Sequence, residues 1–293
     1  MAQLNTTLVT FPAGGTSGTA TVLAVRPLAE GTGVVVDTTP FHPLDHSWPD
    51  QPGDTGVLVA DGAERAVTDC VTGGVGPEGE FAVGTDIPVR RGDETWQWLA
   101  VHVLADNPGS GTSALEPGQQ VELRVDEARR AALSASHTGC HLMALALNEA
   151  LAGRWRKEAR TDGLGHPDFD SLAMDTSRIG LDASTDRYRL GKSLRKKGFD
   201  PEGLREALPE LTAAVNARLA GWLAGDAPVR IDTPGPELTA RRRWVCELPE
   251  ATIEIACGGT HLHRLGELAA LTAELTLSED GSELVVVTTP KRA

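Results

Sequence analysis

The sequence predicts an α+β protein in which a barrel-like β domain precedes an α+β domain. Short Val-, Leu- and Thr-rich runs fill about the first hundred residues, a long apolar helical run follows, and helical and β-like runs share the remainder. The length of 293 residues suffices for one large domain or two ordinary ones. With 40% apolar and 23% charged residues, the composition is typical of a soluble globular protein.

The N-terminal domain is expected over residues 1–110. Gly, Pro and Asp residues separate its candidate strands, and short strands at this spacing are typical of a small barrel or sandwich. The segment 106–119 is rich in Gly, Pro and Ser, which indicates a linker and therefore a domain boundary. The candidate strands are GTATVLAVRPL, GTGVVVDTTPF, TGVLVADG and WQWLAVHVLAD.

The second domain is expected over residues 118–293 and opens with a strand and a long helix. The run QQVELRVD ends at Asp126, whose side chain can cap a helix that begins at Glu127. The helical pattern continues to about Leu151, and Gly153 is a typical stop signal.

The rest of the second domain combines helix and strand. Residues 153–202 are polar and lack a clear period, so we expect an irregular, extended region there. The end of the chain predicts a hairpin with Asp280 and Gly281 at its turn. Between these segments lie a second helical run, PEGLREALPELTAAVNARLAGWLAG, and two β-like runs, PVRIDTP and RRRWVCELPEATIEIA.

The charge and the cysteines limit the function classes. A net charge of −14 opposes non-specific adhesion to nucleic acid or anionic lipid, although a local basic patch can still bind RNA. Four cysteines are too few for a disulfide scaffold, which favours reduced thiols in a cytoplasmic protein. No signal-peptide pattern and no membrane-spanning apolar run are visible, so we expect no membrane association.

Two histidines, His137 and His141, lie four residues apart in the long helical run. Residues at this spacing share one helix face, so both rings can approach one point. Two helical histidines at this distance also arise often by chance. Cys140 between them is expected to be a packing residue, as free cysteines usually are.

A second pair, Cys257 and His261, flanks Gly258 and Gly259 in the segment ACGGTH. Two glycines favour a tight loop over a helix. A thiolate and an imidazole from this loop can complete a tetrahedral Cys/His₃ set, which suits Zn²⁺. Neither the His-Glu-x-x-His pattern of zinc peptidases nor the His-x-Glu and Pro-Cys-x-x-Cys patterns of zinc deaminases occurs.

Four ordered motifs resemble the alanyl/threonyl-tRNA synthetase editing domain superfamily, which includes freestanding alanyl-tRNA editing proteins. The resemblance covers about residues 20–293 and includes both proposed halves of the metal site. The motifs are VVVDTTPFHPLDHSWPDQPGDTG, VELRVDEARRAALSASHTGCHLMALALNEAL, LPELTAAVNARLAGWLAGDAPVRI and CGGTHLHRLGEL.

The resemblance implies ATP-independent hydrolysis of the ester that joins a wrongly attached amino acid to the 3′ end of a tRNA. It implies that the chain is a trans-editing deacylase, with an α+β editing domain as its second domain. The amino acid is expected to be Ser, Ala, Thr or a Thr analogue such as fluorothreonine. The implied zinc ligands are His137, His141, Cys257 and His261, and the implied catalytic residues are Thr138, Gln51, Gly259 and Thr260.

Three positions depart from the family pattern or carry its specificity. Asp54 is retained in the stretch that bears on amino-acid choice, where Trp48 replaces a small residue. Gly139, two residues before the second histidine, is smaller than usual and can make room for a bulkier acyl side chain. These three residues are the predicted substrate-binding residues.

The run RYRLGKSLRKK in the region 153–202 contains six basic residues and no acidic one. Such a run is either a solvated surface or a phosphate-binding one, with Tyr188 able to stack on a terminal base. The predicted tRNA-binding residues are Arg187, Arg189, Lys192, Arg195, Lys196 and Lys197.

Two other function classes remain open. A zinc-stabilised RNA-binding module without catalysis would keep the ligands, and a metal-dependent hydrolase of small esters or amides would not need the basic run. The sequence is compatible with a monomer or a homodimer.

Overall fold

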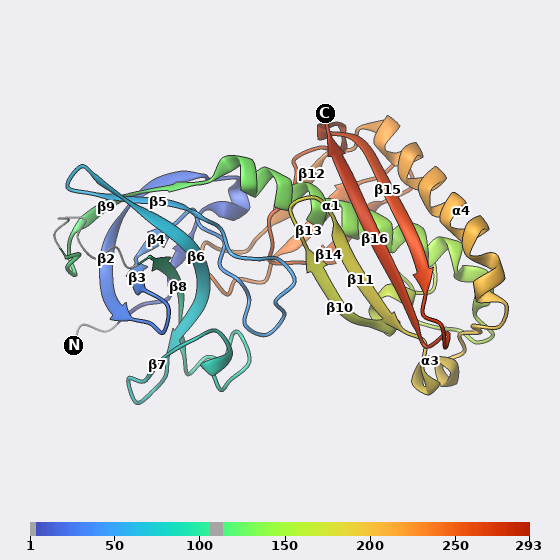
Figure 1. The fold of residues 1–293 in the computed structure, drawn as a ribbon, viewed down its shortest axis with the longest axis horizontal. Helices are drawn as coiled ribbons and strands as arrows, with labels where there is room; N and C mark the ends of the chain where they lie inside the picture. Colours follow the sequence, from blue (N-terminus) through green and yellow to red (C-terminus); the bar gives the residue numbers. More distant parts are fainter. Residues whose placement is uncertain (1–3, 106–113) are drawn as a thin grey trace. The chain divides into compact units, whose positions relative to one another are not determined.

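The computed structural model describes residues 4–105 and 114–293 (Figure 1), so residues 106–113 of the predicted linker lie outside the described residues. Internal contacts divide the chain into two compact units. The first comprises Met1–Arg130, Thr233–Arg242 and Gly258–Thr260, and the second comprises Ala131–Asp232, Arg243–Cys257 and His261–Ala293. The α+β class predicted from the sequence is confirmed.

The first unit is built on antiparallel strands whose pairings form a closed cycle. Its strands and 3₁₀ helices are β1 (Leu8–Val9), η1 (Phe11–Ala13), β2 (Ser17–Pro27), β3 (Thr32–Val36), β4 (Thr38–Thr39), β5 (Gly56–Ala60), β6 (Ala63–Val75), β7 (Phe81–Val83), η2 (Gly84–Asp86), β8 (Gln97–Leu104) and β9 (Gln120–Val125). The order is β5-β9-β2-β3-β8-β6-β7, and β6 also pairs with β5. Asp61 and Gly62 make the β5–β6 turn with positive φ, which suits a two-residue hairpin.

Strands β3 and β8 bury residues on both of their faces. Trp98 and Ala100 of β8 belong to the larger core of the first unit, whereas Leu99 and Val101 pack in a second cluster with Val35. Burial on both faces explains why β8 reads as a nearly continuous apolar run rather than an alternating one.

The boundary of the first unit differs from the predicted one. The sequence placed the run before Asp126 in the second domain, but β9 pairs with β2 and β5 inside the first sheet. The predicted cap is present, since Asp126 Oδ1 accepts a hydrogen bond from the Arg129 backbone N–H at 3.0 Å. The first unit therefore extends to Arg130 rather than to residue 110.

The second unit contains two antiparallel sheets and two long helices. Its elements are α1 (Glu127–Ala150, whose first turn belongs to the first unit), η3 (Ala152–Arg154), α2 (Phe169–Ala173), β10 (Met174–Ile179), β11 (Ser184–Arg189), α3 (Lys192–Lys197), α4 (Leu204–Gly225), β12 (Val229–Asp232), β13 (Arg243–Glu247), β14 (Thr252–Ala256), η4 (Leu265–Glu267), β15 (Leu268–Leu277) and β16 (Glu283–Arg292). The sheet orders are β10-β11-β16-β15 and β12-β13-β14.

Helix α4 runs along β15, as Figure 1 shows in orange and red. The Asn216 amide exchanges two hydrogen bonds of 2.8 Å with the backbone of Ala273, which ties the helix to this edge strand. Val215, Leu219 and Trp222 of α4 are buried in the main core of the unit. Strands β15 and β16 form the predicted C-terminal hairpin.

The region 153–202 is more regular than the sequence predicts, because it supplies strands β10 and β11. Strand β11 alternates buried and exposed residues, but its buried residues are Ser184, Asp186 and Tyr188. An alternation of polar residues leaves no apolar period to detect, which is why the strand was missed.

Candidate metal centre

Helix α1 brings His137 and His141 onto one face. The two ring centroids are 5.0 Å apart, as expected for residues separated by four positions. The helix is buried next to these histidines because the apolar residues that follow them, Leu142, Met143 and Leu145, pack in the main core of the second unit.

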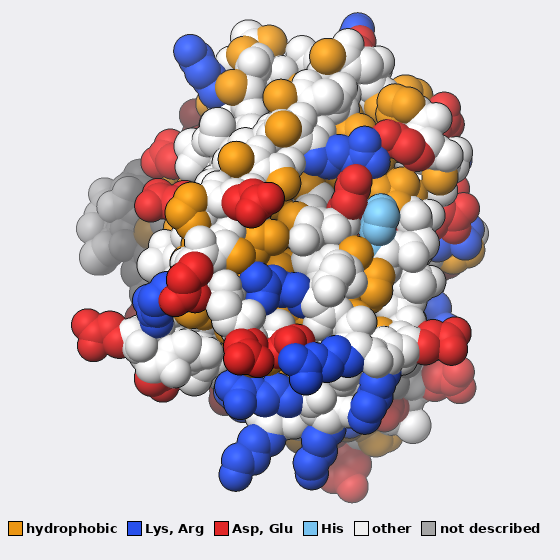
Figure 2. Space-filling model, turned by 90° about the vertical axis from the view of Figure 1, so that its right-hand side faces the viewer, with side chains coloured by type: hydrophobic (Ala, Val, Ile, Leu, Met, Phe, Trp, Pro, Cys, Tyr) orange, Lys and Arg blue, Asp and Glu red, His pale blue; other side chains and the backbone are white. Residues whose placement is uncertain are grey.

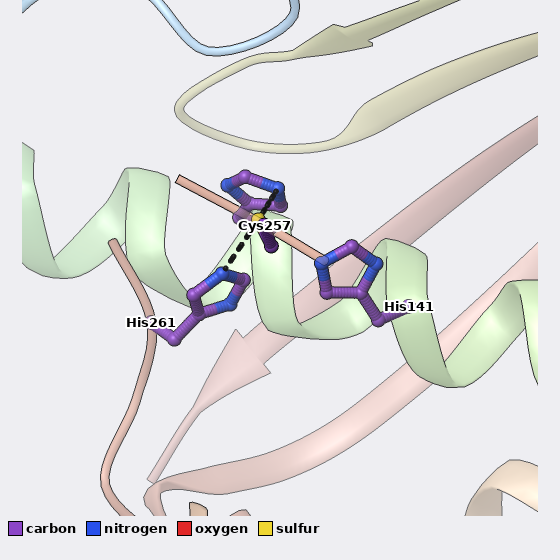
Figure 3. Close-up of side chains that lie close together, drawn as sticks. His141, Cys257 and His261 are labelled. Carbon is purple, nitrogen blue, oxygen red and sulfur yellow. Dashed lines mark hydrogen bonds between the residues drawn. The ribbon is translucent and has the colours of Figure 1, made fainter. Parts of the chain in front are cut away.

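The other two residues come from the loop that follows β14, which lacks regular secondary structure as predicted. Cys257 Sγ lies 3.3 Å from His137 Nε2 and 3.2 Å from His261 Nε2. One donor atom from each of the four residues lies within 4.8 Å of every other (Figure 3). The structure therefore brings all four predicted ligands together.

The donor set fits a zinc ion. Metal–donor bonds of about 2.0–2.3 Å in tetrahedral geometry place neighbouring donor atoms about 3.3–3.6 Å apart, close to the 3.3 and 3.2 Å that separate Cys257 Sγ from the two imidazole nitrogens. His141 Nε2 is buried and has no hydrogen-bond partner among the described residues. A buried nitrogen in this position is accounted for when a cation accepts its lone pair.

Burial also keeps the imidazoles of α1 in the form that binds a metal. It lowers the pKa of His137 to about 3, and burial together with the neighbouring His137 lowers the pKa of His141 well below its usual value. Neutral imidazoles offer a lone pair, so neither ring must lose a proton before it binds a cation at neutral pH.

Thr138 contacts the second half of the centre. Its Oγ1 lies 3.3 Å from His261 Nδ1 and accepts a hydrogen bond from the Leu262 backbone N–H at 3.1 Å. The other ring nitrogen of His261, Nε2, faces Cys257. In the tautomer that carries its proton on Nδ1, this proton points to Thr138 and the lone pair of Nε2 is available to a metal. Thr138, predicted to be catalytic, therefore contacts a candidate ligand in this structure.

Sequence reasoning missed Trp244, which covers the centre. The Trp244 ring centroid is 5.1 Å from that of His141 and 6.1 Å from that of His261, and the side chain is fully buried. Trp244 lies on β13 in the segment RRRWVCE, where nothing in the local pattern distinguishes it from a core residue.

In the first unit, Gln51 and Thr260 form a reciprocal pair. Gln51 Nε2 donates to Thr260 Oγ1 at 2.9 Å, and the Thr260 backbone N–H donates to Gln51 Oε1 at 3.1 Å. Both residues are buried, as is Gly259. Because Thr260 directly precedes His261 in the chain, the Gln51 amide holds the residue next to a candidate ligand.

Asp54 is a structural residue in the first unit rather than an accessible one. It is fully buried and forms an ion pair with Arg130, whose Nε lies 2.9 Å from Asp54 Oδ1. Its Oδ2 also accepts a hydrogen bond of 2.5 Å from the His42 backbone N–H. These contacts fix the loop that contains the predicted specificity residues.

The other two predicted specificity positions have different surroundings. Trp48 is 45% exposed in its loop. A Cβ added at Gly139 would lie 2.8 Å from Leu271 Cδ1, so Leu271 of β15 already occupies that space. Gly139 thus permits close packing of α1 against β15, which corrects the expectation that it leaves room for an acyl group.

Arg91 is a further residue that the sequence did not indicate. It forms an ion pair with Asp45 and donates a hydrogen bond of 2.8 Å to the Leu238 carbonyl. A Cβ at Gly258 would lie 3.7 Å from Arg91 Nη1. Although burial opposes ionisation of Asp45, the charge of Arg91 and hydrogen bonds from Ser47 lower its pKa to about 2.

The basic run divides between a strand and a helix. Arg187 and Arg189 lie on β11 and form ion pairs of 2.6 Å with Glu283 and Asp175. The expectation that Tyr188 stacks on a base is wrong, because its ring is fully buried and its hydroxyl donates to Asp170 Oδ1 at 2.8 Å. The exposed members of the run on α3 are Lys192, Arg195, Lys196 and Lys197.

No helix in residues 4–105 and 114–293 is long and apolar enough to cross a membrane.

Sequence comparison identifies alanine–tRNA ligases as relatives, whereas no family model matches the chain. The enzyme of Halorubrum lacusprofundi is 27% identical over 275 residues, which cover 93% of this chain and 24% of the relative. The enzyme of Rhodopseudomonas palustris is 29% identical over 257 residues, covering 84% of this chain and 24% of the relative. The enzyme of Desulfosudis oleivorans is 35% identical over 117 residues, covering 39% of this chain and 10% of the relative.

Among solved structures, a bifunctional dehydratase-cyclase domain from ambruticin biosynthesis matches at 10% identity over 93% of this chain and 95% of that chain, with a TM-score of 0.15, which does not indicate a shared fold. The similarity to the ligases extends over most of this chain but over less than a third of their length. This similarity supports the resemblance of the chain to the alanyl/threonyl-tRNA synthetase editing domain superfamily.

Proposed function

We propose that this protein is a trans-editing aminoacyl-tRNA deacylase. It hydrolyses the ester of a mischarged tRNA that carries a small or hydroxylated amino acid, such as Ser, Ala, Thr or fluorothreonine. The observation that supports this most strongly is the convergence of His137, His141, Cys257 and His261 in a chain related to alanine–tRNA ligases. The protein works in the cytoplasm, where its substrates are formed.

The four converging residues would hold Zn²⁺, which supplies Lewis-acid chemistry for ester hydrolysis. Thr138 keeps the His261 ring oriented through the contact at Nδ1. Within the first unit, the Gln51 amide holds the hydroxyl and the backbone N–H of Thr260, the residue that follows Gly259. A fixed loop backbone can offer N–H groups to a developing oxyanion without reorganisation.

The proposal is tested by deacylation assays on tRNAs charged with Ser, Ala, Thr and fluorothreonine. We expect the wild type to release at least one of these amino acids and His137→Ala to lose that activity together with bound zinc. His263→Ala is the matched control, because it removes an exposed imidazole two residues beyond His261. It should retain both activity and metal.

The alternatives give different results in the same assays. A non-catalytic RNA-binding module would bind tRNA and zinc but leave every ester intact. A small-ester hydrolase would cleave free amino-acid esters and ignore charged tRNA. Either result would overturn the deacylase proposal.

A further inference from the structure

Two basic segments that lie far apart in the sequence share one exposed surface of the second unit. The segment around Arg156 and Lys157 pairs with the end of α3, since the Arg156 N–H donates to the Gly198 carbonyl at 2.8 Å. Lys157 Nζ also lies 3.3 Å from the Lys196 carbonyl oxygen. Only the second of these segments belongs to the basic run of the sequence, so the fold enlarges the basic surface.

The anchoring of α3 turns its cations outward. Leu194 and Phe199 are each 2% exposed and belong to the main core. Gly198 ends the helix at φ 112°, and a Cβ there would lie 2.8 Å from Lys157 Cβ, so the two segments approach closely. Lys and Arg side chains accordingly gather at the lower edge of the face in Figure 2, at the height where Figure 1 places α3.

The cations of α3 differ from most cations of the second unit in their surroundings. In the described ranges, no ion pair involves Lys157 or any of the four cations of α3, whereas Arg156 pairs with Asp200 and Glu202. Like charges held this close repel one another, and a polyanion relieves that repulsion. We call Lys157, Lys192, Arg195, Lys196 and Lys197 the α3 surface.

A neighbouring groove of about 670 Å³ is less suited to an anion. Arg195 and Lys157 reach into its lining, but Glu206, Glu279 and Asp280 also line it. Of the other two cations in the lining, Arg156 pairs with Asp200, and Arg205 donates to the carbonyls of residues 278 and 279. The outward-facing cations of α3 are therefore the stronger candidate for phosphate contact.

We propose that the α3 surface binds the phosphate backbone of RNA and reads no base. The choice of RNA rests on the proposed deacylase function. The absence of base reading follows from the aromatic residues nearby: Tyr188 and Phe199 are buried, and Trp155 packs against Phe199 with ring centroids 5.4 Å apart. Single-stranded bases are usually recognised by stacking on exposed aromatic rings, which this part of the described surface lacks.

The test compares two double variants that change the net charge equally. Lys196→Gln/Lys197→Gln removes two unpaired cations, and Arg187→Gln/Arg189→Gln removes two that are paired. Binding of uncharged tRNA is measured by fluorescence anisotropy over a salt series. The lysine variant should lower the slope of log K against log salt by about two and weaken binding on the order of ten-fold at 0.1 M salt.

The arginine variant should leave the slope within about half of a unit of the wild type, because its two cations are already neutralised. Wild-type binding should be equal for two tRNAs of different sequence and for an RNA hairpin. Equal slopes for the two double variants, or lysine-dependent binding to anionic vesicles but not to RNA, would overturn the proposal.

A deacylation assay shows whether the α3 surface proposal fails alone or together with the deacylase proposal. If charged tRNA is deacylated while both double variants keep the wild-type slope, the α3 surface is not the phosphate contact and the deacylase proposal stands. If the wild type neither binds nor deacylates any tRNA, both proposals fall.

Discussion

Two buried histidine sites in this molecule have opposite hydrogen-bonding patterns. In the first unit, His102 Nδ1 lies 3.1 Å from the Val34 carbonyl oxygen, and its Nε2 lies 2.8 Å from Thr39 Oγ1. A carbonyl only accepts, so Nδ1 carries the proton and the Thr39 hydroxyl donates to Nε2. Both nitrogens of His102 are satisfied by neutral protein groups.

In the second unit, the imidazole nitrogens face one another and a thiol instead. His137 and His261 direct Nε2 toward Cys257, and His141 Nε2 has no partner in the described part of the chain. Burial lowers the pKa at both sites, to about 4 for His102 and about 3 for His137. Burial therefore does not distinguish a ligand from a structural histidine, but convergence of lone pairs does.

The sharpest test of this comparison substitutes one histidine from each site with leucine. His141→Leu should abolish stoichiometric zinc binding and weaken affinity by more than about a hundred-fold, because a ligand is lost. His102→Leu should keep the zinc but lower the free energy of unfolding by about 2–4 kcal/mol, because Thr39 and Val34 lose their partner. Zinc content by mass spectrometry and urea unfolding of the metal-free protein separate the two effects.

Two outcomes would contradict this difference between the two histidine sites. Zinc retained by His141→Leu at wild-type affinity would exclude this residue from the metal site. Zinc lost from a folded His102→Leu protein would show that the buried hydrogen bonds of the first unit control the centre.

The pH dependence of His102→Leu gives a second, smaller effect. Burial lowers the pKa of His102 in the folded protein to about 4, below the ordinary histidine value of 6.5, so the unfolded state binds more protons between these values. The contribution of His102 is complete above pH 6.5 and decreases by up to about 3 kcal/mol as the pH falls toward 4. The stability difference between wild type and His102→Leu should shrink accordingly in urea titrations at pH 7.0, 5.5 and 4.5.

A difference that stays constant over this range would mean that His102 titrates alike in the folded and unfolded states. Other acidic groups contribute equally to both proteins, so they cancel in the difference. The measurement therefore reports on this one imidazole.

The candidate ligands were predictable because their pattern is local. The spacing of His137 and His141 places both on one helix face, and the glycines between Cys257 and His261 indicate a loop. Convergence of the two halves depends on tertiary packing over more than a hundred residues. The residue types of the two pairs made their convergence a hypothesis, and the family resemblance implied the same four ligands.

The remaining differences arise where polar residues are buried or where pairing is non-local. Asp186 and Tyr188 occupy inward positions on β11, so the strand carried no apolar period and Tyr188 looked exposed. Strand β9 looked like the start of a second domain because its partners lie about a hundred and about sixty residues upstream. Which cations of the basic run are ion-paired also depends on Glu283 and Asp175, which no local pattern links to it.

The smallest expected effect concerns Thr138, which contacts a ligand without being one. Thr138→Val keeps the shape of the side chain but removes the hydroxyl that holds His261 Nδ1 and the Leu262 N–H. Loss of such a support should weaken zinc affinity by about ten-fold while the protein stays folded and binds one zinc at saturation. Competition with a chromophoric chelator measures this directly, without relying on activity.

Thr138→Ser separates orientation from packing, because it restores the hydroxyl and removes only a methyl group. Wild-type affinity in Thr138→Ser together with weakened affinity in Thr138→Val would assign the effect to the hydrogen bonds at His261. If both variants bound zinc equally well, Thr138 would not orient the ligand. Its hydroxyl would then support only the Leu262 backbone, and the difference between the two histidine sites would depend on the ligands alone.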